Sequence, residues 1–403
     1  MIVLSAVAAS GSAARAGGVT RRVRAVVPVL AAEAIARGVF PGAVVAVIRG
    51  RERLLFEAFG HAQVVPWRRP MTVNTLFDMA SLTKPIATTT AVLQLRERGM
   101  LDLDEPVAAH LPAFAAGGKD RVTIRHLLTH TSGLPAWEIL YLPGRAAGGR
   151  PGARPCRSIA EAVARICEMP VDRPPGREVV YSDLGFIILG HLVELLARTS
   201  TRAYAQRFIL GPLSMRHTRY TPPRAWWPRC AATEDGNAYE RVKAAEQGVG
   251  RWFGWRKHVL RGEVHDGNAW YVGRGVAGHA GLFSTAADVA RFAQAVLRGG
   301  TLAGRRVLTR DSVAEATRDQ TPGLNPGRRG LGWSLSGWTF FGTRASPASF
   351  GHTGFTGTSL LIDPERDLIV VLLTNRVHPS AQGVGLLEFR PAFHDALIEA
   401  VDG

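Results

Sequence analysis

The sequence predicts an α+β fold in which an antiparallel β-sheet is flanked by helices and interrupted by a long, mostly helical insertion. Three observations support this prediction. Strand-like apolar runs lie near both ends of the chain, helix-like segments and loops fill its middle, and no repeat of solenoid period is present. One sheet that takes strands from both ends of the chain accounts for this order.

The N-terminal quarter predicts a helix, a hairpin and a second helix. Pro28 suits the first turn of a helix, where a missing amide donor costs nothing. Residues 43–48 and 54–59 are apolar runs on either side of a short polar turn, which is typical of a β-hairpin. Residues 81–98 have helical periodicity.

The middle of the chain is richer in loops. Residues 141–157 are rich in Gly, Pro and Arg and predict a surface loop. Residues 158–167 and 184–197 predict helices. The stretch 222–270 carries five tryptophans without regular periodicity, which predicts irregular structure. We expect these tryptophans to form a packed wall in preference to a sugar-binding platform.

The last 120 residues return to regular elements. A helix is expected over 285–297, capped by its first residue. Residues 350–354, 359–363 and 367–375 predict strands, and 391–401 a closing helix.

These elements divide the chain into one domain and a preceding segment. Residues 1–19 are expected to be a disordered or signal-like N-terminus. The domain covers residues 20–403, with an α/β part at about 20–95 and 275–403 and a helical insertion at about 96–274.

The composition is that of a globular chain, with 403 residues, 46% apolar and 20% charged. The net charge of +16 raises the question of a nucleic-acid partner. However, the arginines are scattered, and the sequence contains no long basic run and no nucleic-acid motif. We therefore expect solvated surface arginines and no nucleic-acid partner. Only four of the 49 basic residues are lysines, so a lysine in a motif stands out.

Cysteines and termini bear on location. The three cysteines have no Cys or His partner at zinc-site spacing, so we expect free thiols and no metal. No apolar run reaches the roughly 20 residues of a membrane span. Residues 1–9 are apolar and 14–16 resemble a cleavage site, but a basic n-region is missing. Two locations stay open, periplasmic or secreted with an export signal, and cytoplasmic without one.

Three short motifs occur in order along the chain: Ser81-Leu82-Thr83-Lys84, Tyr181-Ser182-Asp183 and His352-Thr353-Gly354. A serine and a lysine three residues apart on a helix lie on one face, so the amine reaches the hydroxyl. A serine hydroxyl becomes a good nucleophile when a nearby base takes its proton. A lysine near apolar or cationic groups acquires a lowered pKa and can act as that base. Whether Lys84 or Tyr181 is the main general base stays open.

A second group of residues completes the predicted chemistry. The phenol of Tyr181 can share or relay the serine proton. The glycine-rich edge at 352–357 lets a substrate approach the backbone. The amides of Ser81 and Phe355 are the expected oxyanion donors.

These motifs resemble those of the serine β-lactamase and penicillin-binding protein family, above all its class C β-lactamase-like branch of esterases and D-amino-acid carboxypeptidases. Residues 101–104, 123–135, 174–176 and 278–284 are similar to further segments of that branch. The resemblance covers about residues 20–400. It implies a β-lactamase/transpeptidase-like fold with the site between the sheet and the helical region.

The resemblance also implies roles for individual residues. Ser81 would be the acylated nucleophile and Lys84 its base or proton relay. Tyr181 would be a second relay, which protonates the leaving group and activates the deacylating water. Asp183, His352, Thr353, Gly354 and Phe355 would contact substrate. No cofactor or metal is implied, and the partner would be a small molecule or short peptide.

Two departures from the family pattern weaken the β-lactamase alternative. His352 stands where class C β-lactamases have lysine, and it carries less charge at neutral pH. Asp183 stands where many relatives have asparagine and adds a negative charge. We therefore expect a serine hydrolase of esters or D-amino-acid peptides. A β-lactamase and a catalytically inactive peptide- or glycan-binding protein of the same fold remain the alternatives.

Several residues also admit structural explanations. Tyr181 could be a tyrosine of the core with a satisfied hydroxyl, and His352 could be a strand histidine with only a structural role. His126 and His130 have metal-ligand spacing, but Leu127 stands where a zincin needs glutamate, so a structural turn is expected. His265, Asp266 and His279 could line the cleft, although a role in bracing loops is favoured.

Overall fold

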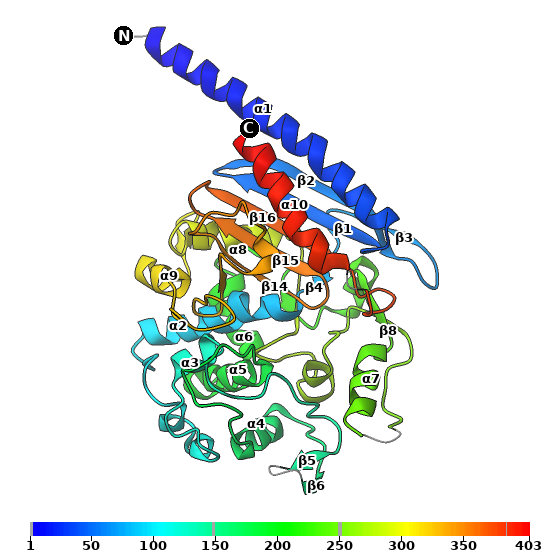
Figure 1. Ribbon diagram of the computed structural model, residues 1–403, viewed down its shortest axis with the longest axis vertical. Helices are drawn as coiled ribbons and strands as arrows, with labels where there is room; N and C mark the ends of the chain where they lie inside the picture. The colour runs from blue at the N-terminus through cyan, green and yellow to red at the C-terminus, as the bar shows by residue number, and fades with distance from the viewer. Residues whose placement is uncertain (1–2, 147–149, 249–251, 384) are drawn as a thin grey trace.

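The computed structural model describes residues 3–146, 150–248, 252–383 and 385–403, and it confirms the α+β prediction (Figure 1). A seven-stranded sheet takes its strands from both ends of the chain, in the order β13-β14-β15-β16-β1-β2-β3. All neighbouring pairs are antiparallel. The strands are β1 (Gly42–Arg49), β2 (Glu52–Gln63), β3 (Arg69–Pro70), β13 (Ser334–Leu335), β14 (Phe350–Thr353), β15 (Thr358–Asp363) and β16 (Leu368–Thr374).

The central strands β1 and β16 are buried on both faces, which explains their unbroken apolar sequences. Successive side chains of a strand point to opposite faces. Val44 and Ala46 accordingly join one hydrophobic core, whereas Val45 and Val47 join a second core on the other side of the sheet. The predicted hairpin of β1 and β2 is confirmed.

Helices cover both faces of the sheet (Figure 1). Helices α1 (Val3–Ala36) and α10 (Gly385–Asp402) pack together on one face. Helix α8 (Ala286–Leu297) packs on the other face, and Thr285 caps it by accepting a hydrogen bond from the Asp288 amide, as predicted. Helix α2 (Thr90–Glu97) lies beyond α8 toward the helical region.

The helical region between β3 and α8 is drawn in cyan to yellow in Figure 1. Beyond α2, its α-helices are α3 (Ile124–Leu128), α4 (Ile159–Glu168), α5 (Asp183–Ala197), α6 (Thr201–Ala205) and α7 (Ala238–Glu246). A small sheet, β4-β10-β7, connects this region to the main sheet; its strands are β4 (Phe77–Asp78), β10 (Leu282–Ser284) and β7 (Arg219–Tyr220). The remaining paired strands are β5 (Gly144–Ala146), β6 (Arg150–Ala153), β8 (Ala232–Asp235), β9 (Val259–Arg261), β11 (Thr301–Leu302) and β12 (Arg305–Arg306), and helix α9 (Arg310–Thr317) precedes β13. The domain bounds given above stay a prediction.

Helix α1 begins well before Pro28, where the sequence placed its start. The reason is a buried stripe at helical spacing, Val19, Val23, Val27, Ala31 and Ala34, which packs in the core shared with α10. Pro28 therefore lies inside the helix. The C-terminal helix is likewise longer than predicted and contains Pro391.

The segment 81–98 is helical, as predicted, but not uniformly so. A 3-10 turn (Ala80–Leu82) leads into a π-helical stretch (Lys84–Thr89) and then into α2. Pro85 lacks an amide donor, and the hydroxyl of Thr90 donates to its carbonyl at 2.9 Å. This irregular start of the helix carries the first motif.

The loop predicted at 141–157 contains the β5–β6 pair, and its residues 147–149 lie outside the described residues. The stretch 222–270 is more regular than predicted, because α7 and the β8–β9 pair lie within it. Within the described residues, no single helix is long and apolar enough to cross a membrane; α5 and Thr201–Leu210 would pass only as a pair bent by 77°. All three cysteines are buried and free.

Candidate active site

Strand β4 leads into a strained turn that presents Ser81. Ala80 has a φ of 44°, which a residue with a side chain seldom adopts. The buried carboxylate of Asp78 holds this turn by accepting hydrogen bonds from the amides of Ala80 (2.9 Å) and His265 (2.6 Å). Burial raises the pKa of Asp78, and these two amides oppose the rise. The sequence analysis did not recognise Asp78 as a support of the site.

The first two motifs meet at Lys84. Its ammonium group is fully buried and donates to Ser81 Oγ at 2.9 Å and to Asp183 Oδ1 at 2.6 Å. A third hydrogen bond, of 3.3 Å, goes to the backbone oxygen of His279. The structure thus brings together Ser81, Lys84 and Asp183, three residues that the sequence singled out.

The pKa of Lys84 is not lowered. Burial is the largest influence and lowers this pKa, but the negative charge of Asp183, with the help of Tyr181, raises it above the ordinary lysine value. Lys84 is therefore a cation at neutral pH. The sequence argument considered apolar and cationic neighbours, whereas Asp183 supplies an anion at ion-pair distance.

Tyr181 lies directly beside this group. Lys84 Nζ is 4.7 Å from the centre of its ring. Its buried hydroxyl makes no hydrogen bond of good geometry among the described residues. Burial raises its pKa, although Lys84 and Ser81 both act to lower it. The phenol is therefore protonated at neutral pH, which suits a proton donor better than a base.

His130 supports Tyr181 from behind. Its ring packs at a tilt against the phenol with 4.4 Å between ring centres, and its Nδ1 accepts a hydrogen bond from the Ser182 amide at 3.0 Å. His126, by contrast, closes a capping box with Thr123 at the start of α3. Both histidines have structural contacts, and no cluster of metal-ligating side chains occurs among the described residues.

The third motif lies on β14 beside Tyr181. His352 is buried, and its Nδ1 donates to the Thr353 carbonyl at 2.7 Å. Burial lowers the pKa of His352 well below its ordinary value, and the charges of Lys84 and Arg329 lower it further. The imidazole is therefore neutral, and it offers a carboxylate no positive charge.

The turn after β14 is fixed to the segment before Ser81. Thr356 Oγ1 donates to the Asp78 carbonyl at 2.7 Å, and Thr358 Oγ1 to the Met79 carbonyl at 3.1 Å. Gly354 lies so close to this segment that an added Cβ would stand 2.6 Å from the Met79 oxygen. Phe355 belongs to this turn and lines the same cavity as Ser81, as two oxyanion donors would require.

A cavity of about 310 Å³ opens over Ser81. Of the predicted site residues, Ser81, Tyr181, Asp183 and Phe355 line it, whereas Lys84, His352, Thr353 and Gly354 are not among its lining residues. Trp137 and Tyr239 add aromatic surface that the sequence did not assign to the site. Tyr239 packs on Phe355, with 4.9 Å between ring centres.

The cavity also has polar lining residues, which are Glu240, Lys243, His265, Asp266 and His279. The two histidines and Asp266 do line the cleft, one of the two roles considered for them. Glu240 was missed, because α7 lies in a stretch without clear periodicity. Its carboxylate accepts from the Tyr141 hydroxyl at 2.6 Å and the Gly267 amide at 2.7 Å.

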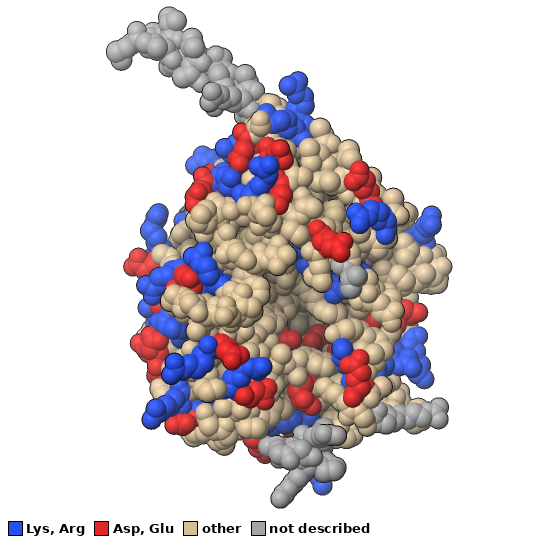
Figure 2. Space-filling view, in the orientation of Figure 1, with Lys and Arg blue, Asp and Glu red and all other residues tan. Residues whose placement is uncertain are grey.

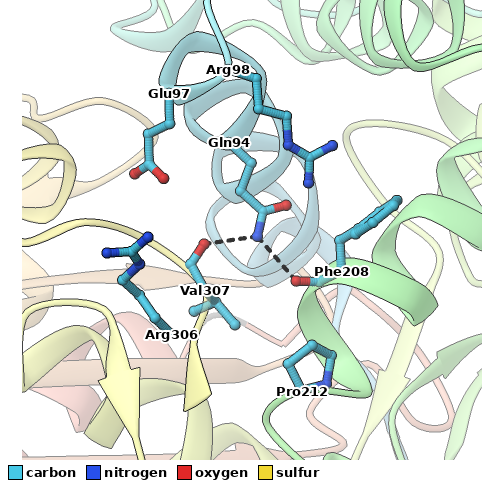
Figure 3. A pocket seen from close by; sticks show the side chains of 7 residues that line it. All are labelled: Gln94, Glu97, Arg98, Phe208, Pro212, Arg306 and Val307. Carbon is cyan, nitrogen blue, oxygen red and sulfur yellow. Dashed lines mark hydrogen bonds between the residues drawn. The ribbon is translucent and has the colours of Figure 1, made fainter. Parts of the chain in front are cut away.

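A second cavity, of about 360 Å³, lies at α2 and lacks such a constellation (Figure 3). The Gln94 amide there donates to the carbonyls of Phe208 (3.0 Å) and Val307 (2.7 Å). Gln94 therefore joins α2 to two neighbouring segments.

The surface charge does not form a single basic field on the face shown in Figure 2, where Lys and Arg are interspersed with Asp and Glu. This distribution agrees with the expectation of solvated arginines.

Comparison with known proteins agrees with the fold and the motifs. The family model described as Beta-lactamase matches residues 28–390. A Bacillus subtilis (strain 168) protein named N-acetylmuramyl-L-alanine amidase is 34% identical over 357 residues, which cover 84% of this chain and 78% of the relative. A Salmonella typhi protein, provisionally named a D-alanyl-D-alanine carboxypeptidase, is 33% identical over 358 residues, 84% of this chain and 79% of the relative.

Solved structures share the architecture. The structure of EstCE1, a hydrolase with promiscuous acyltransferase activity, superposes with a TM-score of 0.69 at 23% identity and covers 96% of this chain and 99% of its own. Together with the family match over most of the chain, this similarity leads to one conclusion. The chain belongs to the β-lactamase family and is a serine hydrolase.

Proposed function

We propose that Ser81 is the nucleophile of an acyl-enzyme hydrolase that cleaves esters and short peptide amides. The observation that carries this proposal is the position of Lys84, whose ammonium group lies between Ser81 Oγ (2.9 Å) and Asp183 Oδ1 (2.6 Å). A buried lysine that contacts both a serine hydroxyl and a carboxylate can move the serine proton away.

Acylation then proceeds by a proton relay. Ser81 Oγ attacks the substrate carbonyl carbon and gives its proton to Lys84, as Lys84 gives one of its own to Asp183. The amides of Ser81 and Phe355 stabilise the resulting oxyanion. Tyr181 protonates the leaving nitrogen or oxygen, and the bond to the leaving group breaks. The proton on Asp183 returns through Lys84 to Tyr181.

The charges around the cavity favour a substrate that is uncharged near the reacting bond. Lys84 is paired with Asp183, His352 is neutral, and Arg329 is buried against the ring of Tyr181. Lys243, the lysine that lines the cavity, pairs with Glu246 at 2.8 Å. A terminal carboxylate on a substrate would therefore find little positive charge to bind. We accordingly expect β-lactams to be poorer substrates than esters and amides.

The names of two relatives indicate which kind of amide bond to consider. By their names, the Bacillus subtilis relative acts on an amide bond to L-alanine and the Salmonella typhi relative on one between D-alanines. We propose amide bonds adjoining alanine, without a free carboxylate on the alanine next to the bond, as the natural class and simple esters as surrogate substrates.

Activity-based labelling tests the nucleophile. A fluorophosphonate probe is expected to label the wild-type protein and to leave Ser81→Ala unlabelled, with loss of p-nitrophenyl acetate turnover. Ser132→Ala is the matched control, because Ser132 is a buried serine in a different turn. Labelling of Ser81→Ala at the wild-type level would refute the proposal.

A substrate panel tests the ranking. We expect p-nitrophenyl acetate and an amide of alanine to be cleaved with a higher kcat/KM than nitrocefin. Equal efficiency on nitrocefin would favour the β-lactamase alternative.

A further inference from the structure

Arg329 is a buried cation beside the reacting groups, and the acylation steps described above give it no task. It is 4% exposed, and its Nη1 donates to Ser334 Oγ at 2.8 Å. Its Nε makes no hydrogen bond, and no carboxylate pairs with it within the part of the chain that the structure describes. Burying a charge without an ionic partner is costly, so the position of this charge calls for an explanation.

The guanidinium lies against two aromatic rings. Its central carbon is 5.4 Å from the centre of the Tyr181 ring and 4.3 Å from that of Trp338. Burial lowers the pKa of Arg329 to about 10, while the charge of Tyr181 acts to raise it. Arg329 is therefore a cation at neutral pH, and Tyr181 is the reacting group that it faces.

The charge of Arg329 also reaches the groups around Tyr181. The rings of His130 and His352 lie 4.4 Å and 6.0 Å from the Tyr181 ring, measured between centres. Burial is the main cause of the low pKa of each histidine, and the charge of Arg329 lowers both pKa values further. Both imidazoles are therefore neutral. Of the described groups that contact the Tyr181 ring, Lys84 and Arg329 carry the positive charge.

A negative charge develops on Tyr181 in the proposed relay. When the phenol gives its proton to the leaving oxygen or nitrogen, this charge forms on Tyr181 Oη. It lasts until the proton held by Asp183 returns through Lys84. Lys84 gives and takes protons during this cycle, whereas the guanidinium of Arg329 keeps its charge throughout. A fixed charge beside the place where a new charge develops lowers the barrier without reorganisation.

We propose that Arg329 stabilises the phenolate that forms when Tyr181 protonates the leaving group, and so acts as a positioning residue of the general acid. This inference rests on the acyl-enzyme at Ser81 proposed above. As the bond from the carbonyl carbon to the leaving atom breaks, its electron pair goes to that atom, which takes the proton from Tyr181 Oη. The nearby positive charge makes the phenol a stronger acid. The effect is largest for a leaving group that needs a proton in order to depart.

The leaving-group dependence of Arg329→Met tests this role. Ethoxide needs a proton to leave, whereas p-nitrophenolate is stable enough to leave without one. For both acetate esters, kcat/KM reports the acylation step. We expect the ratio of kcat/KM for ethyl acetate to that for p-nitrophenyl acetate to fall about 10- to 100-fold in the variant. Arg329→Gln removes the charge but keeps a donor for Ser334 Oγ, and it should show the same fall.

A double-mutant cycle shows whether Arg329 acts through the phenol. Tyr181→Phe keeps the ring and removes the hydroxyl. In that background Arg329→Met should change the ratio by less than about twofold, because no phenolate is left to stabilise. Arg98→Met is the matched control. Arg98 lies over the rings of Tyr204 (5.8 Å) and Phe208 (4.7 Å) at the second cavity (Figure 3), and its loss should leave the ratio unchanged.

The contrary outcomes are distinct. The inference is overturned if folded Arg329→Met or Arg329→Gln keeps the wild-type ratio, or if Arg329→Met lowers the ratio as much in the Tyr181→Phe background as in the wild type. Fluorophosphonate labelling of Ser81 should persist in both Arg329 variants. Labelling that persists in Ser81→Ala would instead refute the nucleophile assignment, so the two proposals fail separately.

Discussion

The protonation state of one lysine governs the chemistry of this site at the residue scale. A buried lysine without a counter-ion tends to lose its proton. Asp183, at 2.6 Å, reverses that tendency, and the same carboxylate is the acceptor to which Lys84 can pass a proton. The aspartate that departs from the family pattern is therefore compatible with catalysis, which weakens the hypothesis of an inactive binding protein.

The variant Asp183→Asn should lower the pKa of Lys84. The negative charge that raises this pKa is removed, while the burial that lowers it remains. We expect a fall of roughly one to three units. Nitrogen NMR of the lysine side chains can follow the titration, since the chain has only four lysines and Lys84→Met identifies the signal. An unchanged midpoint would show that Asp183 does not control Lys84.

Glu240 makes stability depend on pH. Burial, followed by the charge of Asp266, raises its pKa to about 7 from an ordinary value near 4.5. Between these values the folded state binds more protons than the unfolded state, so the free energy of unfolding falls as pH rises through this window.

Glu240→Gln should remove this dependence. We expect urea unfolding to show the variant gaining about 2–3 kcal/mol relative to wild type between pH 4.5 and pH 7.5. A constant difference between the two proteins over that range would mean that Glu240 does not titrate there.

At the scale of elements, the site is an assembly of turns held by buried hydrogen bonds. The β14–β15 turn is bonded to the Ser81 turn through Thr356 and Thr358, and Asp78 ties the Ser81 turn to the loop before His279. No helix or strand alone contains the site. Its geometry depends on close approach between backbone segments, above all at Gly354.

Gly354→Ala should disturb the oxyanion donors. The added Cβ would lie 2.2 Å from Thr358 Oγ1 and 2.6 Å from the Met79 oxygen, so the two turns must separate. We expect kcat for p-nitrophenyl acetate to fall about 10- to 100-fold, and the free energy of unfolding to fall by about 1–3 kcal/mol. A folded variant with the wild-type kcat would show that the oxyanion donors do not depend on this turn.

At the scale of the molecule, the sheet separates two cores with different tasks. One core lies between the sheet and the helical region and supports the site, and the other lies under α1 and α10. Substitutions in the second core should therefore change stability without changing catalysis.

Val27→Ala tests this separation. Val27 is a fully buried residue of α1, in the core on the face of the sheet away from Ser81. We expect the free energy of unfolding to fall by about 1–2 kcal/mol, with kcat/KM for the ester unchanged within twofold. A large loss of kcat/KM at unchanged stability would contradict this division.

The sequence predicted the parts of the fold that depend on local pattern. The β1–β2 hairpin, α5, α8 and the three C-terminal strands follow from apolar periodicity and end signals. The start of α1 was missed, because packing against α10 overrides the helix-start signal of Pro28. Helix α7 was missed for lack of periodicity, and with it Glu240.

The candidate site was predicted only where motifs mark it. Ser81, Lys84 and Asp183 meet as expected, since their motifs carry recognisable spacing. The pKa of Lys84 was not predictable, because its sign depends on a distance between residues 99 positions apart. His279 and Asp266 could be noticed in the sequence, but their pairing is a property of the tertiary structure.

Trapping the acyl-enzyme tests the central claim most directly. Acid quench during turnover of p-nitrophenyl acetate, followed by peptide mapping, should place one acetyl group on Ser81 and none on the corresponding peptide of Ser81→Ala. An acetyl group on a different residue, or undiminished turnover by Ser81→Ala, would contradict the account.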